Sequence, residues 1–139
     1  MSTSPADLAP TPSPERTILV VEDEVLVRLV IAEYLRDCGY RVHEAAHAQE
    51  AIAVLESPDV TIDIVFSDVV MPGNLDGFGL ARWVRAHRPH VEVILTSTID
   101  RSAEIAGMLC EAGPLLSKPY EPQGVVERIK QLIARADRS

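Results

Sequence analysis

Short apolar runs alternate with segments of helical periodicity along most of the chain. The apolar runs are rich in β-branched residues, and they predict strands at 17–21, 40–45, 62–67, 91–97 and 114–117. Between and after these runs, apolar residues recur every three or four positions. This spacing predicts helices at 24–39, 47–57, 77–88, 101–112 and 122–136.

This alternation predicts an α/β fold, in which a doubly wound, five-stranded parallel sheet is covered by helices on both faces. In such open sheets, ligands bind beyond the carboxyl ends of the strands, where the strand order reverses. Residues 1–15 are rich in proline and poor in bulky apolar side chains, so we predict a disordered tail there. Residues 16–139 would then form one domain.

The composition narrows the partners and the compartment. With 139 residues, 47% of them hydrophobic, the chain can bury a single sizeable core. Its net charge of −8 predicts no binding to nucleic acid or to anionic membrane surfaces, because both repel an acidic protein. The sequence has no signal peptide pattern and no apolar run of about 20 residues. We therefore expect a cytoplasmic protein that does not cross a membrane.

The two cysteines, Cys38 and Cys110, lie in apolar positions of predicted helices. The sequence leaves a disulfide open. It favours two buried thiols, because disulfides are rare in reducing compartments.

Polar side chains gather where the predicted strands end. Glu22 and Asp23 follow the first strand, Asp68 follows the third, Ser97 the fourth and Lys118 the fifth. In a parallel sheet these side chains would meet at one edge. Carboxylates that share a cleft raise one another's pKa, and a divalent cation relieves the repulsion. Hard oxygen ligands of this kind suit Mg²⁺.

Asp68 can also act as a nucleophile toward a phosphoryl group, forming an acyl phosphate. The transferred group carries negative charge on its oxygens, so it needs a metal, a cation and a hydrogen-bond donor around it. Mg²⁺, Lys118 and Ser97 would supply this set. Each motif alone has a simpler reading, as a solvated acidic turn or a turn-forming aspartate. Their joint placement at strand ends favours the phosphoryl chemistry.

Three motifs in order, "ILVVEDE" (18–24), "DVVMPG" with a following "DG" (68–77) and "KPY" (118–120), resemble the receiver domain of two-component response regulators. The resemblance runs from about Thr17 to Ala136. It implies a flavodoxin-like (βα)5 fold. It also implies a signalling domain rather than an enzyme, which takes a phosphoryl group from a histidine kinase or a histidine phosphotransfer protein.

The resemblance also implies a role for each matching residue. Asp68 resembles the phosphoacceptor, and Asp23 resembles the acid that binds Mg²⁺ (or Mn²⁺) directly. Glu22 would act on the metal through water, and the backbone carbonyl of Val70 would be a further ligand. Two residues would bind the phosphoryl group, namely Lys118 and the switch hydroxyl, which is Ser97 or, alternatively, Thr96.

The sequence departs from the receiver pattern in three places. Thr98 stands where a small residue usually follows the switch hydroxyl, and it could narrow access to Asp68. Leu115 replaces the usual switch aromatic, and the loop over 73–77, "GNLDG", is one residue longer than the commonest form. None of these changes removes a group needed for phosphoryl transfer.

Phosphorylation would reshape the segments that follow Ser97. We expect residues 101–112, 114–117 and 122–136 to form an output surface for a downstream protein or a homodimer. A pseudo-receiver that binds partners without phosphorylation is one alternative, and the receiver portion of a hybrid histidine kinase is another. The starting Met1 and the polar end favour a stand-alone chain. An aspartyl phosphatase would carry a second acid two residues after its nucleophile, where this chain has Val70.

Overall fold

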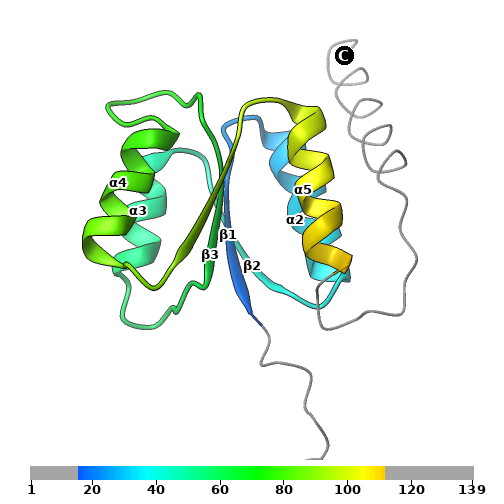
Figure 1. Ribbon diagram of the computed structural model, residues 1–139, viewed down its shortest axis with the longest axis horizontal. Coiled ribbons are helices and arrows are strands. Elements are labelled where there is room, and N and C mark those ends of the chain that lie inside the picture. The colour runs from blue at the N-terminus through cyan, green and yellow to red at the C-terminus, as the bar shows by residue number, and fades with distance from the viewer. Residues whose placement is uncertain (1–15, 112–139) are drawn as a thin grey trace, which may run out of the picture.

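The computed structural model describes residues 16–111, which fold into alternating strands and helices (Figure 1). In chain order the elements are β1 (Thr17–Val21), α2 (Val25–Asp37), β2 (Arg41–Ala45), α3 (Ala48–Glu56), β3 (Ile64–Asp68), α4 (Gly77–His87), β4 (Glu92–Thr96) and α5 (Ile99–Glu111). The predicted elements in this part of the chain are confirmed, with their ends shifted by at most two residues. The predicted strand at 114–117 and helix at 122–136 lie outside the described residues.

The strands form a parallel sheet in the order β2-β1-β3-β4. The described residues thus contain four of the five strands that the sequence predicts. The chain moves outward from β1 to β2 and then returns to β3 on the other side of β1. The strand order therefore reverses between β1 and β3, where a ligand site is expected.

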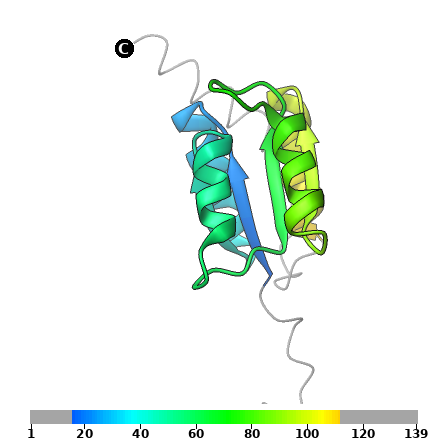
Figure 2. The same cartoon turned by 90° about the vertical axis from the view of Figure 1, so that its left-hand side faces the viewer.

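Helices cover both faces of the sheet, in pairs. The first pair is α2 and α5, which pack on the face that carries Ile18 and Val20 of β1. The second pair is α3 and α4, which pack on the opposite face, with Leu19 and Val21 of the same strand. Figure 1 shows the two pairs on either side of the strands, and Figure 2 shows the same layers after a quarter turn. Both faces of β1 are buried, which explains its unbroken apolar sequence.

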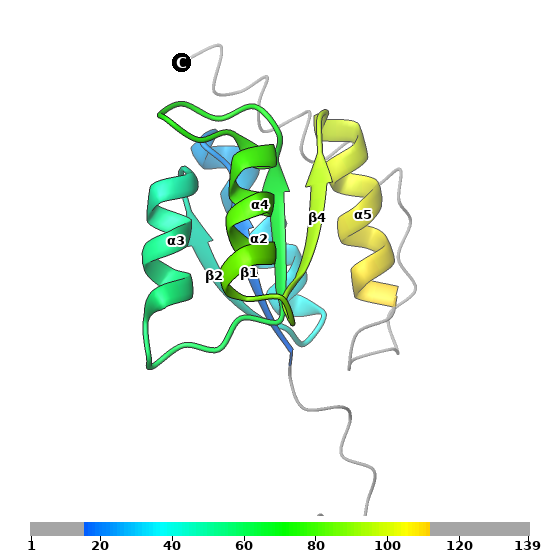
Figure 3. The ribbon, with the colours of Figure 1, turned by 60° about the vertical axis from the view of Figure 1, so that its left-hand side comes forward.

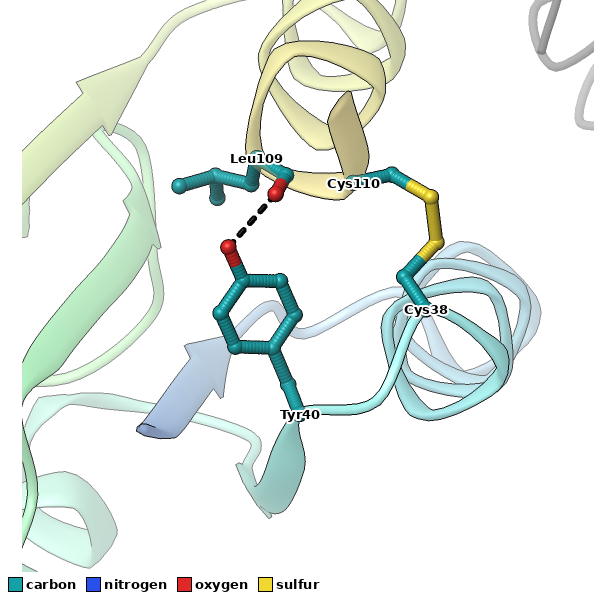
Figure 4. The surroundings of a disulfide bond; sticks show 4 residues. All are labelled: Cys38, Tyr40, Leu109 and Cys110. Carbon is teal, nitrogen blue, oxygen red and sulfur yellow. Dashed lines mark hydrogen bonds between the residues drawn. A yellow bond between two sulfur atoms is a disulfide. The ribbon is translucent and has the colours of Figure 1, made fainter. Parts of the chain in front are cut away.

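The structure joins Cys38 and Cys110 in a disulfide (Figure 4). This finding overturns the expectation of two free thiols. Cys38 follows α2 directly and Cys110 lies in the last turn of α5, with their Cα atoms 5.2 Å apart, within the usual range for a disulfide. Beside the link, the Tyr40 hydroxyl donates a hydrogen bond to the Leu109 carbonyl. The pairing depends on α5 lying against α2, which local sequence patterns do not encode.

Candidate functional site

Three acidic side chains meet where β1 and β3 end, at the upper edge of the sheet in Figure 3. Val21 pairs with Ser67 in the sheet register, so the residues that follow on each strand lie next to each other. One carboxylate oxygen from each of Glu22, Asp23 and Asp68 lies within 4.8 Å of the other two. The structure thus brings together acids that are 45 residues apart in the sequence.

The three acids differ in exposure. Glu22 is buried, Asp68 is half-buried and Asp23 is exposed. Burial, together with the negative charges of Asp68 and Asp23, raises the pKa of Glu22 to about 8, against a hydrogen bond from the Glu24 backbone N–H. Burial also raises the pKa of Asp68, opposed by the backbone N–H groups of Val70 and Val69. The three carboxylates repel one another when they are ionised, and a bound cation would reduce this repulsion.

The donor set fits a hard divalent cation. Carboxylate oxygens within 4.8 Å of one another can share a single ion, and oxygen ligands are those that Mg²⁺ prefers. The Val70 side chain is exposed at the rim of the same cleft, two residues past Asp68. The Val70 N–H lies 3.4 Å from Asp68 Oδ1, a local contact between residues two positions apart.

The acids open into a cleft of about 450 Å³. Its lining also includes hydroxyl groups from the end of β4 and the start of α5, so that the full set is Glu22, Asp23, Glu24, Asp68, Val70, Met71, Pro72, Ser97, Thr98 and Ser102. The same cleft therefore contains both acidic and hydroxyl side chains.

The two candidate switch hydroxyls have different surroundings. Ser97 is exposed and lines the cleft. Thr96 is buried, and its Oγ1 atom lies 2.7 Å from Ser102 Oγ in a hydrogen bond. Neighbouring residues of a strand point to opposite sides. Of these two, only Ser97 lines the cleft with the acids.

Thr98 and Ser102 hold the start of α5 at the edge of the cleft. The Thr98 side chain accepts a hydrogen bond from the Arg101 N–H at 3.0 Å, and its carbonyl accepts one from the Ser102 N–H at 3.0 Å. These are the contacts of a helix N-cap. Ser102 was not among the site residues predicted from the sequence. Its position on the buried face of the helix, next to Ala103, is the signal that could have revealed it.

Gly77 is a second residue that the sequence reading left without a role. Its N–H donates to the Val69 carbonyl at 2.8 Å, which ties the start of α4 to the strand end that carries Asp68. A Cβ atom at this position would lie 2.5 Å from the Asp68 carbonyl oxygen and 2.8 Å from the Val69 Cα. Only glycine, which has no Cβ atom, allows the start of α4 to lie this close to the end of β3. Asp76, just before it, caps α4 by accepting a hydrogen bond from the Gly79 N–H.

An arginine on α2 fixes the backbone behind the acids. The Arg28 guanidinium donates to the Glu22 carbonyl at 2.9 Å and to the Glu44 carboxylate at 3.2 Å. It thus joins α2 to the ends of β1 and β2, and it satisfies a carbonyl next to the buried acid.

The remaining predicted site residues, Lys118 and Leu115, lie outside the described residues. Their expected roles stay predictions from the sequence.

Comparison with known proteins identifies the family. The model of the response regulator receiver domain matches residues 18–130. This chain belongs to the response regulator receiver domain family. Receiver domains are signalling domains of two-component systems, and the family generally uses Mg²⁺ at an acidic site. In this chain, Glu22, Asp23 and Asp68 form an acidic cluster.

Relatives of this receiver domain occur in proteins of different architecture. Sensor kinase CckA of Brucella abortus is 35% identical over 122 residues, which cover 87% of this chain and 13% of the kinase. The chain spans about half the length of the transcriptional regulators that it matches. From the net charge we expected no nucleic-acid partner. The match to transcriptional regulators leaves this expectation without support.

Solved structures place the fold among receivers. The crystal structure of a putative response regulator from Chloroflexus aurantiacus is 34% identical and has a TM-score of 0.56, covering 87% of this chain and 99% of that one. A chain from the crystal structure of histidine kinase ThkA in complex with response regulator protein TrrA is 31% identical with a TM-score of 0.55, covering 60% and 69%. The flavodoxin-like α/β class is confirmed. Among residues 16–111, no helix is both long and apolar enough to cross a membrane.

Proposed function

We propose that this receiver accepts a phosphoryl group from a phosphohistidine onto Asp68, in a reaction that depends on Mg²⁺, and thereby changes its contacts with other proteins. The observation that carries the proposal is the convergence of Asp68 with Glu22 and Asp23 within 4.8 Å, in a cleft that also contains Ser97. In the reaction, an Asp68 carboxylate oxygen bonds to phosphorus as the P–N bond breaks, and the imidazole leaves with the bonding electron pair.

Asp23, Asp68 and the Val70 carbonyl would bind the metal directly, and Glu22 would bind it through water. When bound, Mg²⁺ (or Mn²⁺) would neutralise charge on the acids and on the phosphoryl oxygens. The raised pKa values of Glu22 and Asp68 support this assignment, because both groups gain most from a nearby cation.

Two further groups would hold the transferred phosphoryl group. Ser97 would donate its hydroxyl from the end of β4, a role favoured over Thr96 because the Thr96 hydroxyl already pairs with Ser102. Lys118, which lies outside the described residues, would pair with a phosphoryl oxygen. These contacts would shift β4 and α5, and this shift would transmit the phosphorylation of Asp68 to surfaces farther away.

The donor would be a histidine kinase or a histidine phosphotransfer protein in the cytoplasm. The pairing of ThkA with TrrA supports a kinase as the partner. The downstream target would be a protein, or a second copy of this chain that binds through α5 and the segments after it. The match to a sensor kinase supports a receiver within a hybrid kinase as the second candidate.

Phosphoramidate tests the proposal, because it is a small donor with the P–N bond of phosphohistidine. The protein is incubated with phosphoramidate with and without Mg²⁺, and its intact mass is measured. The proposal predicts one added phosphoryl group that requires Mg²⁺ and is removed by hydroxylamine, which cleaves acyl phosphates. An unmodified protein that still binds Mg²⁺ would favour a pseudo-receiver.

A further inference from the structure

Hydrogen bonds close the short connection between β1 and α2 on itself. The Glu24 backbone N–H donates to the Glu22 carboxylate at 3.1 Å, and the Arg28 backbone N–H donates to the Glu24 carbonyl at 2.9 Å. The Arg28 guanidinium then returns to the start of the connection, where its Nη1 donates to the Glu22 carbonyl at 2.9 Å. One side chain of α2 therefore holds the backbone at the point where the acidic cluster begins.

The Glu22 carbonyl belongs to the peptide group that joins two acids of the cluster, Glu22 and Asp23. A peptide group is planar and includes both flanking Cα atoms, so the orientation of this carbonyl sets the position of the Asp23 Cα atom. The Glu22 N–H donates to the Ala45 carbonyl at 3.0 Å, which continues the pairing of β1 with β2. The backbone of Glu22 is thus held on one side by β2 and on the other by Arg28.

An acid on the neighbouring strand holds Arg28 in place. The Arg28 Nε donates to Glu44 Oε1 at 3.2 Å, so the guanidinium binds a carboxylate and a backbone carbonyl at once. The two side chains are 17% and 22% exposed, and salt screens such a partly buried ion pair less than an exposed one. A lysine ammonium lacks the planar fork of the guanidinium and could not make both contacts in this geometry. The shape of the Arg28 side chain therefore matters as well as its charge.

We propose that Arg28 is a positioning residue for the divalent-cation site, and that Glu44 orients it. By fixing the peptide group between Glu22 and Asp23, Arg28 would keep both carboxylates where they can share an ion with Asp68. Neither Arg28 nor Glu44 would touch the metal. Removing a partner that orients metal ligands typically weakens binding by about 10–100-fold. The inference rests on the proposed function, because it requires the acidic cluster to bind Mg²⁺.

Arg36 is a matched control on the same helix. Its Nη2 donates to the second oxygen of Glu44 at 3.2 Å and to the Val42 carbonyl at 3.0 Å. Arg36 thus binds the same acid as Arg28, but among residues 16–111 none of its hydrogen bonds reaches the acidic cluster. Its loss would remove ion pairs between α2 and β2 without releasing the backbone beside the acids.

NMR titration of the full chain with Mg²⁺ measures the dissociation constant from the amide signals of Asp23 and Asp68, and urea denaturation measures stability. The variant Arg28→Gln should weaken Mg²⁺ binding by about tenfold or more. The variant Arg28→Lys should stay several-fold weaker than wild type, because it keeps the charge and loses the forked geometry. The variant Arg36→Gln should keep the wild-type dissociation constant even where it lowers stability.

The outcomes separate this inference from the proposed function. A wild-type protein that binds no Mg²⁺ would overturn both. With Mg²⁺ binding by wild type intact, any of three results would overturn the inference alone. They are unchanged binding in Arg28→Gln, full recovery of binding in Arg28→Lys, and a loss in Arg36→Gln as large as that in Arg28→Gln.

A further variant keeps the test decisive if Arg28→Gln does not fold. Glu44→Gln leaves the Arg28 side chain in place and removes the charge that orients it. It should weaken Mg²⁺ binding several-fold, and an unchanged dissociation constant in this variant would overturn the inference.

Discussion

The Thr96 and Ser102 hydroxyls lie 2.7 Å apart in a buried hydrogen bond that joins the end of β4 to α5. Thr96 pairs with Asp68 across the sheet, so this bond lies directly beside the end of β3. It occupies the Thr96 hydroxyl, whereas Ser97 lines the cleft that contains the acids. Thr96 thus has a structural role, whereas its neighbour Ser97 lines the cleft.

Replacing Ser102 by Ala should lower the free energy of unfolding by about 1–3 kcal/mol, because it leaves the Thr96 hydroxyl buried without a partner. The double variant Thr96→Val/Ser102→Ala should recover much of this loss, since it removes both polar groups. Urea denaturation of the single and double variants measures the coupling. A double variant whose loss equals the sum of the single losses would show that the bond contributes nothing.

Thr98 has two separable roles, as a cap of α5 and as a β-branched side chain at the cleft. The variant Thr98→Ser keeps the capping hydroxyl and removes the methyl group. It should take up phosphate from a small donor several-fold faster, with little change in stability. The variant Thr98→Ala should also gain speed but lose about 1 kcal/mol of stability with the cap. Equal uptake rates in all three proteins would exclude a steric role for the methyl group.

Alanine should be far more harmful at Gly77 than at Gly79, although both are buried in the first turn of α4. At Gly77 the new Cβ would meet backbone atoms of Asp68 and Val69, whereas at Gly79 it would meet the flexible Leu75 side chain. We expect Gly77→Ala to cost about 1–3 kcal/mol, as overpacking does. Gly79→Ala is the matched control. Thermal unfolding compares the two, and similar melting temperatures would contradict the close approach at Gly77.

The pH dependence of stability should follow Glu22. Its pKa rises from an ordinary value of 4.5 to about 8 on folding, so between these values the folded protein binds more protons than the unfolded chain. Stability from this group is therefore full below the lower value and is lost as the pH rises through the higher one. The raised pKa of Asp68 acts in the same direction.

Unfolding midpoints in urea without metal should therefore fall from about pH 5 to about pH 9. Saturating Mg²⁺ should raise the midpoint most at the alkaline end, because the cation pairs with ionised carboxylates. The variant Glu22→Gln should flatten the metal-free profile. A wild-type midpoint that rises across this range would contradict the raised pKa of Glu22.

The sequence was sufficient to predict most of the scaffold and the acidic cluster. β-Branched runs such as 17–21 predict buried strands, and the carboxyl ends of parallel strands meet at one edge. The order of residues along the chain is therefore enough to place Glu22, Asp23 and Asp68 together. Because neighbours alternate along a strand, only one of Ser97 and Thr96 could be the switch hydroxyl, and the distance from Gly77 along the sequence favoured Ser97.

The remaining features depend on tertiary contacts that periodicity does not encode. The face of the sheet on which α5 lies decides whether Cys38 can reach Cys110, and helical spacing is the same for either face. The role of Ser102 depends on the same choice, and that of Gly77 depends on how closely α4 approaches β3.

The most direct test of the central claim is intact-mass analysis after incubation with acetyl phosphate and Mg²⁺, for wild type, Asp68→Asn and Asp59→Asn. Asp59 is an exposed acid between α3 and β3, outside the acidic cluster, and serves as the matched control. The account predicts one added phosphoryl group on wild type and Asp59→Asn and none on Asp68→Asn. An equal adduct on Asp68→Asn would contradict Asp68 as the acceptor.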